Sequence, residues 1–331
     1  MLMDPIPPQF ADAIALERST GAHHYTPLPV VLTKGKGVHL WDTAGKKYLD
    51  MMSAYSAVSH GHSHPRLVAA LHRQAKRLAV TSRSFYADTL GPFTAKLAQL
   101  TGLAQAVPMN SGAEAVETAI KAARKWAYTV KGVPADQAEI IVAHNNFHGR
   151  TLGTISFSTA PHYQYGFGPL LAGFKVVPFG DISALQAAIT PHTAAILLEP
   201  IQGEGGLVVP PAGYLQQVRT LCTQNNVLML LDEIQSGLGR TGKMFAFEHE
   251  GARPDGLILG KALGGGLLPV SAFCADEKVM QVFDDGSHGS TFGGNPLAAA
   301  VGLEALNTIE DEGLAANSAT LGAELLATMQ D

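Results

Sequence analysis

Two apolar runs that each lead into a charged residue constrain the fold of this chain most. The run Val227–Leu231 leads directly into Asp232, and the run Gly256–Leu259 leads through Gly260 into Lys261. Short apolar runs bounded by turn residues are typical of buried parallel strands. In open α/β sheets, ligands bind at the carboxyl ends of such strands. The sequence therefore predicts that Asp232 and Lys261 lie at the ligand-binding edge of a parallel sheet.

This pair of residues admits two interpretations. A lysine that is desolvated at a strand end has a lowered pKa and suits Schiff-base chemistry. An aspartate beside it could hold a protonated ring nitrogen, as pyridoxal phosphate requires. Alternatively, Asp232 and Lys261 form a buried ion pair that closes two strand ends. The spacing of the two residues leaves both interpretations open.

Further apolar segments continue the pattern through most of the chain. They alternate with segments of helical periodicity, which is typical of a parallel sheet covered by helices on both faces. The expected strands are 104–109, 139–143, 174–179, 194–199, 227–232, 256–259 and 269–274, and the expected helices are 65–78, 90–100, 113–128, 182–189, 213–225 and 296–310. We therefore predict an α/β fold with one large, seven-stranded, mainly parallel sheet.

The length of the chain favours more than one domain, because 331 residues exceed what a single core usually serves. Residues 1–36 are rich in proline and are expected to be irregular, and a hairpin follows at 38–51. We assign residues 1–60 to a small domain and residues 61–310 to the large domain. The helical pattern in 311–331 has an apolar stripe that needs a partner. We therefore expect it to begin a C-terminal domain that the sequence cuts short.

Composition excludes several classes of function. The net charge is −5, so nucleic acid is not expected as a partner. No apolar run approaches the length of a membrane span, and the N-terminus lacks a signal-peptide pattern. The two cysteines, Cys222 and Cys274, lie far apart and suit a reducing compartment. We therefore predict a cytoplasmic protein without membrane contact.

Residues 110–115 lie between an expected strand and an expected helix, where an anion could bind. Ser111 can cap the helix, and Gly112 permits close approach of a ligand to the backbone. The free N–H groups at the start of the helix carry the positive end of its dipole. These features suit a phosphate group, although an ordinary capped helix has them as well.

Two further loops could contact a ligand. Arg150 follows the expected strand 139–143 and could bind a carboxylate through two hydrogen bonds, and Phe147 could stack on a planar ring. The loop 286–296 offers Ser290 or Thr291 as a phosphate ligand to this or a neighbouring subunit. Taken alone, Arg150 could equally be a solvated surface charge, and the loop could be a flexible link before a helix.

Two other motifs are not expected to bind a ligand. Residues 237–242 match the dinucleotide-binding string GxGxxG, but the string begins five residues after Asp232 and no helix pattern follows it. His60, His62 and His64 alternate along the chain, but Gly61 and Pro65 make this segment a turn without cysteines or clustered acids beside it. We therefore expect neither a nicotinamide cofactor nor a metal.

Six motifs occur in the order typical of one enzyme family. They are NSGAEA at 110–115, NFHGRT at 146–151, EPIQGEGG at 199–206, LDEIQSGLGRTG at 231–242, GKALGGG at 260–266 and GSTFGGNP at 289–296. From about Gly21 onward, the chain resembles the class III (ω-amino) aminotransferases, which are pyridoxal phosphate enzymes of fold type I. The resemblance implies that Lys261 forms the Schiff base with the cofactor and that Asp232 holds the ring nitrogen.

The resemblance also implies how the rest of the cofactor is held. Gln235 would reach the phenolic oxygen, Phe147 would pack on the ring, and the segment Ser111, Gly112 and Ala113 would take the phosphate. Ser290 and Thr291 would complete the phosphate site, with Thr291 reaching the cofactor of the partner in a homodimer. His148 stands where relatives often carry a larger aromatic residue, and we expect it to affect only the packing on the ring.

Within the family, segments 21–32, 40–58, 123–132 and 260–272 are most similar to the members that act on ornithine. The resemblance implies transfer of the δ-amino group of L-ornithine to 2-oxoglutarate, giving glutamate 5-semialdehyde and glutamate. Tyr25 and Arg150 would hold the α-amino and α-carboxylate groups of ornithine, and Tyr55 would line the substrate side. Glu204 would mask a second arginine that the family carries late in its C-terminal domain and that this sequence lacks.

Two alternatives remain open at this stage. The substrate could be that of another ω-aminotransferase, such as acetylornithine or 4-aminobutyrate. The chain could also be a pyridoxal phosphate-binding protein without full turnover, because the second arginine is missing. The room that an acylated α-nitrogen needs beside Tyr25 and Tyr55 favours free ornithine.

Overall fold

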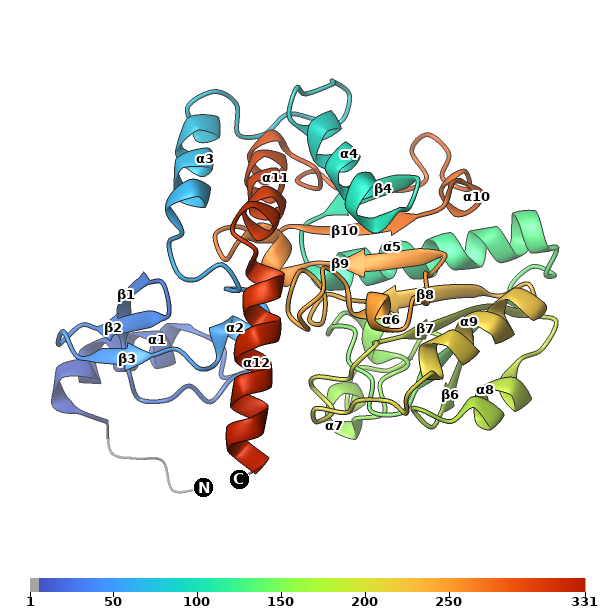
Figure 1. Ribbon diagram of the computed structural model, residues 1–331, viewed down its shortest axis with the longest axis horizontal. Coiled ribbons are helices and arrows are strands. Elements are labelled where there is room, and N and C mark those ends of the chain that lie inside the picture. Colours follow the sequence, from blue (N-terminus) through green and yellow to red (C-terminus); the bar gives the residue numbers. More distant parts are fainter. Residues whose placement is uncertain (1–5, 331) are drawn as a thin grey trace.

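A large twisted sheet forms the centre of the molecule in the computed structural model, which describes residues 6–330 (Figure 1). Its seven strands lie in the order β4-β10-β9-β8-β7-β5-β6. The strands from β9 to β6 are parallel to one another, and β10 runs antiparallel to both β4 and β9. The bounds are β4 Gln105–Met109, β5 Glu139–Ala143, β6 Phe174–Val177, β7 Thr193–Leu198, β8 Leu228–Asp232, β9 Gly256–Leu259 and β10 Ser271–Ala275. The prediction of a mainly parallel, seven-stranded α/β sheet is confirmed.

Helices cover both faces of this sheet, which is why its strands are apolar throughout. Along β7, Ile196 and Leu198 belong to one core cluster, whereas Ala195 and Leu197 belong to a second cluster on the opposite face. This alternation follows from the two-residue period of a strand. The first core contains side chains of α4 Leu90–Thr101, α8 Ile182–Ala188, α9 Tyr214–Gln224 and α11 Pro296–Asp311. The second core contains side chains of α5 Gly112–Trp126 and α10 Glu277–Met280.

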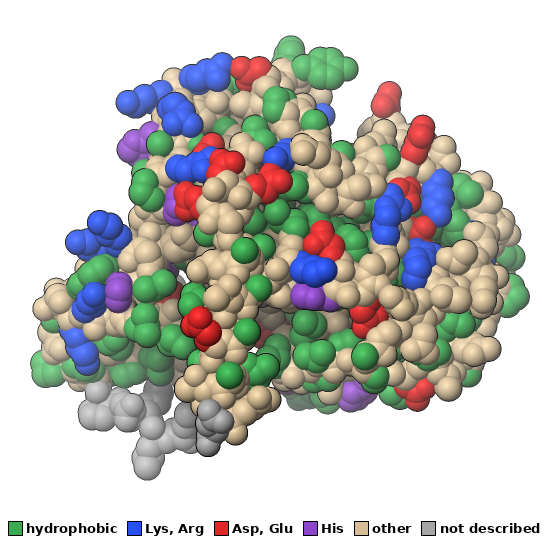
Figure 2. All heavy atoms as spheres, viewed as in Figure 1, with side chains coloured by type: hydrophobic (Ala, Val, Ile, Leu, Met, Phe, Trp, Pro, Cys, Tyr) green, Lys and Arg blue, Asp and Glu red, His purple; other side chains and the backbone are tan. Residues whose placement is uncertain are grey.

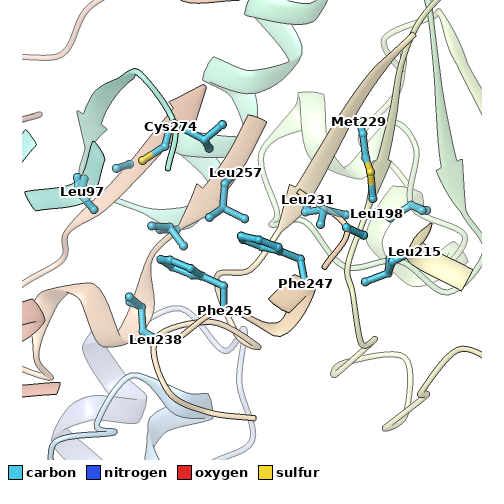
Figure 3. Close-up of a cluster of buried hydrophobic side chains, with 14 of the residues drawn as sticks. Leu97, Leu198, Leu215, Met229, Leu231, Leu238, Phe245, Phe247, Leu257 and Cys274 are labelled. Atoms are coloured by element: carbon cyan, nitrogen blue, oxygen red, sulfur yellow. The ribbon is translucent and has the colours of Figure 1, made fainter. Parts of the chain in front are cut away.

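The first core contains leucine, phenylalanine and methionine side chains from distant parts of the chain (Figure 3). Phe245 and Phe247 stack with their rings 5.7 Å apart and 5° from parallel. They pack beside Leu231 of β8 and Leu257 of β9 (Figure 3). Leu231 directly precedes Asp232, and Leu257 lies on the strand that leads to Lys261. Close packing of this kind leaves the strand ends little freedom to move.

Outside the large sheet, the N-terminal part forms a small antiparallel sheet of β1 Leu32–Lys36, β2 His39–Asp42 and β3 Lys47–Leu49. The expected hairpin is therefore present, but the expectation that all of residues 1–36 are irregular is wrong. Helix α1 Ala11–Thr20 and strand β1 lie in that range, and α1 has no buried residue. Neither has an apolar periodicity that the sequence could have revealed.

Short elements connect these units. They are η1 Pro8–Phe10, α2 Ser53–Ser56, α3 Pro65–Ala75, the π-helical turn η2 Ala127–Lys131, α6 Leu152–Ile155, α7 Pro161–Gln164, η3 Ala246–His249 and η4 Lys261–Gly264. Helix α3 packs against α11. There, Arg66 pairs with Glu304 and Asp311. Basic and acidic side chains lie close together on the face shown in Figure 2.

The last helix, α12 Leu314–Gln330, has no buried residue. It contacts the turn at 239–242, where the Ser318 hydroxyl donates a hydrogen bond to the carbonyl of Arg240. The division into domains at residues 60 and 310 stays a prediction, and residues 1–5 and 331 of the two outer segments lie outside the described residues. In the part of the chain that the structure covers, no helix has the length and apolarity needed to cross a bilayer.

Candidate active site

The carboxyl ends of several strands of the large sheet meet around one pocket. Its wall contains the first turn of α5, which follows β4, and residues 147–149, which follow β5. Glu199 after β7, Asp232 at the end of β8 and Lys261 after β9 complete the side next to the sheet. A parallel sheet brings these residues together because its strands end at the same edge. Asp232 and Lys261 therefore share one site, as the sequence predicts.

More than half of the residues expected from the sequence line this pocket, and the others lie outside its wall. Those in the wall are Gly112, Ala113, Phe147, Glu204, Asp232, Gln235 and Lys261. Those outside it are Tyr25, Tyr55, Ser111, Arg150, Ser290 and Thr291. The first group lies on the large sheet and its loops, whereas the second lies on the N-terminal segment, a helix cap and exposed loops.

Asp232 is held in place by two hydrogen bonds. Its side chain is buried, with a residue exposure of 4%. One carboxylate oxygen lies 2.6 Å from Nδ1 of His148, and the other accepts the N–H of Ile234 at 3.0 Å. Two bonds of this kind fix the direction of the carboxylate. Asp232 therefore has one fixed orientation in the pocket wall.

His148 is fully buried beside Asp232, and sequence reasoning missed this contact. Burial alone would lower the pKa of His148, but the hydrogen bond from His148 to Asp232 and the charges of Asp232 and Glu199 raise it overall. The Nε2 atom of His148 has no hydrogen-bond partner among the described residues. The expectation that His148 affects only ring packing is therefore incomplete, because its other nitrogen binds the carboxylate of Asp232.

Lys261 carries the candidate nucleophile of the site. It follows β9 with a left-handed backbone (φ 45°) that turns the chain into η4. Burial lowers the pKa of Lys261, although the nearby charges of Glu204, Asp232 and Glu199 oppose this effect. No carboxylate of residues 6–330 lies within ion-pair distance of its amine, and Asp232 pairs with His148 instead. The alternative of an Asp232–Lys261 ion pair is therefore wrong, and the amine is free to react.

The start of helix α5 forms an anion site at one end of the pocket. Ser111 caps the helix by accepting the N–H of Glu114, and Glu114 in turn accepts the N–H of Ser111. Gly112 has no room for a side chain, because a Cβ there would lie 2.9 Å from Cδ1 of Ile234. Ser111 takes the N–H of Glu114, whereas the N–H groups of Gly112 and Ala113 precede the first intrahelical bond and remain accessible to a phosphate.

The loop with Ser290 and Thr291 approaches this anion site from outside. The Ser290 hydroxyl accepts a hydrogen bond from the side-chain amide of Asn110 at 3.0 Å, one residue before the helix cap. Thr291 lines a separate depression together with Val80, Ser82 and Arg83. Within one chain, then, Thr291 lies away from the Lys261 pocket.

Arg150 lies beside the pocket without an acidic partner among the described residues. Its guanidinium lies 4.9 Å from the ring of Tyr163, 5.6 Å from that of Tyr25 and 5.9 Å from that of Phe147. Three rings thus hold the cation while leaving its hydrogen-bond donors available for a carboxylate. Tyr163 was not expected from the sequence, since it is one tyrosine in a polar segment without a distinguishing pattern.

Two acids of the 199–206 segment lie in the pocket with different surroundings. Glu204 is exposed and accepts a hydrogen bond from the Gln235 amide at 3.2 Å. Glu199 is buried and accepts the N–H of Phe147 at 3.1 Å. Burial raises the pKa of Glu199 to about 7, and the charge of Asp232 acts in the same direction against that of His148. Glu199 follows the apolar run 194–198 in the same way that Asp232 follows the run 227–231.

These residues fit a planar cofactor that carries a phosphate and an aldehyde. The open N-terminus of α5 suits the phosphate, and the Lys261 amine suits the aldehyde. Asp232 is buried and directed to hold a cationic ring nitrogen, and Phe147 offers an aromatic face. Pyridoxal phosphate has each of these groups, so the site meets its requirements.

Comparison with known proteins agrees with the geometry. The sequence model of the class-III aminotransferase family matches residues 20–331. An ornithine aminotransferase of an Exiguobacterium species is 57% identical over 311 residues, which are 94% of this chain and 78% of the relative. An ornithine aminotransferase of Bordetella pertussis is 56% identical over 315 residues, which are 95% of this chain and 77% of the relative.

Solved structures give the same result. An ornithine aminotransferase structure from Toxoplasma gondii, with pyridoxal phosphate at partial occupancy in its active site, matches with a TM-score of 0.94 and 47% identity. That match covers 95% of this chain and 74% of the other. An acetylornithine aminotransferase from Elizabethkingia anophelis matches with a TM-score of 0.86 and 48% identity, over 96% of this chain and 77% of the other.

Proposed function

The chain belongs to the class III aminotransferases, and on that premise we propose that it transfers the δ-amino group of L-ornithine to 2-oxoglutarate. As a member of this family it is a pyridoxal phosphate-dependent transaminase. The products would be glutamate 5-semialdehyde and glutamate. The similarity to ornithine aminotransferases, at 56–57% identity over most of the chain, supports ornithine as the amino donor.

The observation that carries the choice of substrate is the position of Arg150. Its guanidinium has no acidic partner within the described chain and lies beside the pocket that contains Lys261. A carboxylate bound there would place the α-carbon of an amino acid at the rim of the site, with Tyr25 next to it. The far end of the substrate would then extend toward Lys261, which suits an amino group several carbons away.

Residues of this chain divide the chemistry among them. Bound pyridoxal phosphate supplies a ring that withdraws electrons from the substrate carbon. Asp232, fixed by His148 and the N–H of Ile234, would hold the ring nitrogen in its protonated form. The Nζ atom of Lys261 would act as the general acid and base that takes up and returns the proton of the substrate carbon. Burial lowers the pKa of Lys261, which favours the neutral amine that can accept that proton.

Other residues hold the reacting groups in position. We assign the phosphate to Ser111, Gly112 and Ala113 at the start of α5, with Ser290 close by through Asn110. Phe147 would pack on the ring. Gln235 would bind the phenolic oxygen, and its position depends on Gly203, where a Cβ would lie 1.5 Å from its side-chain oxygen.

Roles for Tyr55 and Glu204 rest on the resemblance together with their positions. Glu204 lies in the pocket wall, so its carboxylate can form an ion pair with a cationic group of a substrate or with a basic side chain that binds 2-oxoglutarate. Tyr55 is exposed at the N-terminal segment, where it could contact the outer part of a substrate.

We further propose that the chain acts as a homodimer in the cytoplasm. Thr291 lies outside its own Lys261 pocket, which suits a role at the cofactor of a partner subunit. The buried free thiols of Cys222 and Cys274 suit a reducing compartment. We also keep the assignment of residues 61–310 as the cofactor-binding domain, with 1–60 and 311–331 as parts of a smaller one.

An absorption spectrum of the purified protein tests the reaction. We expect a visible band from the cofactor bonded to Lys261, and we expect ornithine to shift it while acetylornithine and 4-aminobutyrate do not. A shift with either of those amines instead would reassign the substrate. A band that none of the three amines shifts would favour a cofactor-binding protein without turnover, and a protein that shows no band after addition of cofactor would contradict the proposal.

A further inference from the structure

Glu199 is a buried acid in the cofactor pocket to which the proposed reaction assigns no role. It follows β7, the strand between β5, which leads to His148, and β8, which ends at Asp232. Its side chain lines the pocket, and its residue exposure is 8%. One of its oxygens is fixed by the N–H of Phe147, and no lysine or arginine pairs with it among residues 6–330. A buried carboxylate without a cationic partner favours its neutral form.

The charges around Glu199 explain when it should hold a proton. His148 and Asp232 form a buried pair at 2.6 Å, and a protonated His148 balances the charge of Asp232. An ionised Glu199 would add an unbalanced negative charge to this buried cluster. Burial and the charge of Asp232 accordingly raise the pKa of Glu199 to about 7, against the effect of His148. A cationic ring nitrogen at Asp232 would add one positive charge to the same pocket and reverse this balance.

We propose that Glu199 carries a proton in the cofactor-free protein and releases it to solvent when a cationic pyridine ring binds beside Asp232. The positive charges of His148 and the ring then balance the negative charges of Asp232 and the ionised Glu199. No bond other than the O–H of Glu199 breaks in this step. The inference rests on the proposed binding of the ring nitrogen at Asp232, and it couples cofactor affinity to pH.

The direction of the coupling follows from linkage. A group that releases a proton on binding makes affinity rise as the pH rises toward its pKa in the free protein. With a pKa of about 7 in the free protein, affinity should fall below that pH and stay level above it. Relative to a protein that lacks Glu199, the affinity for the cofactor falls by nearly tenfold for each pH unit below about 7. Lys261 and Glu204 also face this pocket, so their contributions have to be separated.

Pyridoxamine 5′-phosphate is the suitable probe for the apoprotein. It has the ring nitrogen and the phosphate but no aldehyde, so it forms no bond with Lys261. We expect the ratio of its dissociation constants in wild type and Glu199→Gln to change on the order of tenfold between pH 8 and pH 6. The titration of the probe itself cancels in this ratio. Glu324→Gln, which changes an exposed acid of helix α12 outside the pocket wall, should keep the pH dependence of the wild type.

Calorimetry gives an independent measurement. Titrations at pH 6 in two buffers with different ionisation enthalpies should show that the wild type releases about one proton more than Glu199→Gln. His148→Gln is a second variant if Glu199→Gln does not fold. It removes the cation beside Glu199, so the pH at which affinity begins to fall should move upward from about 7.

The outcomes separate this inference from the function on which it rests. Equal pH dependence in wild type and Glu199→Gln, with both binding the probe, would overturn the role of Glu199 and leave the cofactor site intact. If a folded His148→Gln variant loses affinity for the probe at the same pH as the wild type, the role of Glu199 is likewise overturned. Failure of the wild type to bind the probe at any pH would overturn the proposed site itself.

Discussion

The two sides of the Lys261 pocket are built in different ways. On the sheet side, His148, Glu199 and Asp232 follow or end neighbouring strands, and all three are buried. On the outer side, Tyr25 is 62% exposed and Tyr55 is 56% exposed, and Arg150 lies on a loop. Under the proposed function, the core of the protein would fix the cofactor end, and the exposed segments would form the end that selects a substrate.

Hydrogen bonding shows the same difference. Both oxygens of Asp232 are engaged, at 2.6 and 3.0 Å. Arg150 makes one long contact, at 3.5 Å to the hydroxyl of Tyr163, and otherwise lies against aromatic rings.

The backbone of the outer side is also strained. The segment 53–56 has four successive non-glycine residues in the left-handed region, which costs about 1 kcal/mol or more for each. A change on the sheet side should therefore affect every substrate, and a change on the outer side only some.

Replacement of Lys261 by alanine should have the largest effect. We expect kcat to fall by at least about 10²–10⁴-fold with every amine, because the general acid–base group is lost. We expect the melting temperature to stay unchanged or to rise, since the amine is partly buried without an ion pair. Turnover with ornithine and thermal melting test the two statements.

Lys243→Ala is the matched control for this prediction. Lys243 lies on an exposed loop, where its amine donates to the carbonyl of Glu248 at 3.3 Å, and it takes no part in the pocket. This variant should keep both activity and the visible band. If Lys261→Ala instead retained turnover with ornithine, another base would perform the proton transfer, and the role of Lys261 would be wrong.

The sequence predicts the sheet side better than the outer side, for a physical reason. Apolar runs are a local signal, so the strands of the large sheet follow from them, and the charged residues after two of these runs point to Asp232 and Lys261. The bond between His148 and Asp232 joins residues 84 positions apart, one in the loop after β5 and the other at the end of β8. No local pattern encodes such a pair, because it depends on the order of strands in the sheet.

The outer side has neither an apolar run nor a charged residue at the end of one. Tyr25 was identified by resemblance to a family, the position of Arg150 left a solvated surface charge equally open, and Tyr163 was not identified at all. Their contact joins the N-terminal segment to the loop after β5 and to helix α7 through ring faces, which leave no periodicity in the sequence. Helix α1 and strand β1 were missed for a similar reason, since almost all of their residues are exposed.

Arg150→Lys should have an intermediate effect that is confined to the outer side. Lysine cannot form the paired hydrogen bonds of a guanidinium with a carboxylate, nor stack flat on the three rings. A loss of about 1.5–3 kcal/mol from one charged hydrogen bond corresponds to a rise of about 10–100-fold in the KM for ornithine. Steady-state kinetics should show little change in kcat, and the affinity for pyridoxamine 5′-phosphate should stay the same.

Arg253→Lys provides the comparison for this variant. Arg253 is an exposed arginine that pairs with Asp276 far from the pocket wall, so its replacement should leave KM unchanged. A weaker affinity of Arg150→Lys for the cofactor probe would show that the two sides of the pocket are not independent.

Tyr25→Phe should have the smallest effect and tests the outer side most finely. The ring stays against Arg150, and only the hydroxyl proposed to bind the α-amino group is lost. A neutral hydrogen bond contributes about 0.5–1.5 kcal/mol, so the KM for ornithine should rise by about twofold to tenfold. The KM for 2-oxoglutarate should not change, because that substrate has no amino group.

Tyr165→Phe, at an exposed tyrosine of the nearby loop, is the control and should change neither KM value. If Tyr25→Phe instead lowered kcat equally for all amines, Tyr25 would contribute to the chemistry rather than to selection. The contrast between a fixed cofactor side and a selective outer side would then fail at the residue where the two are most easily separated.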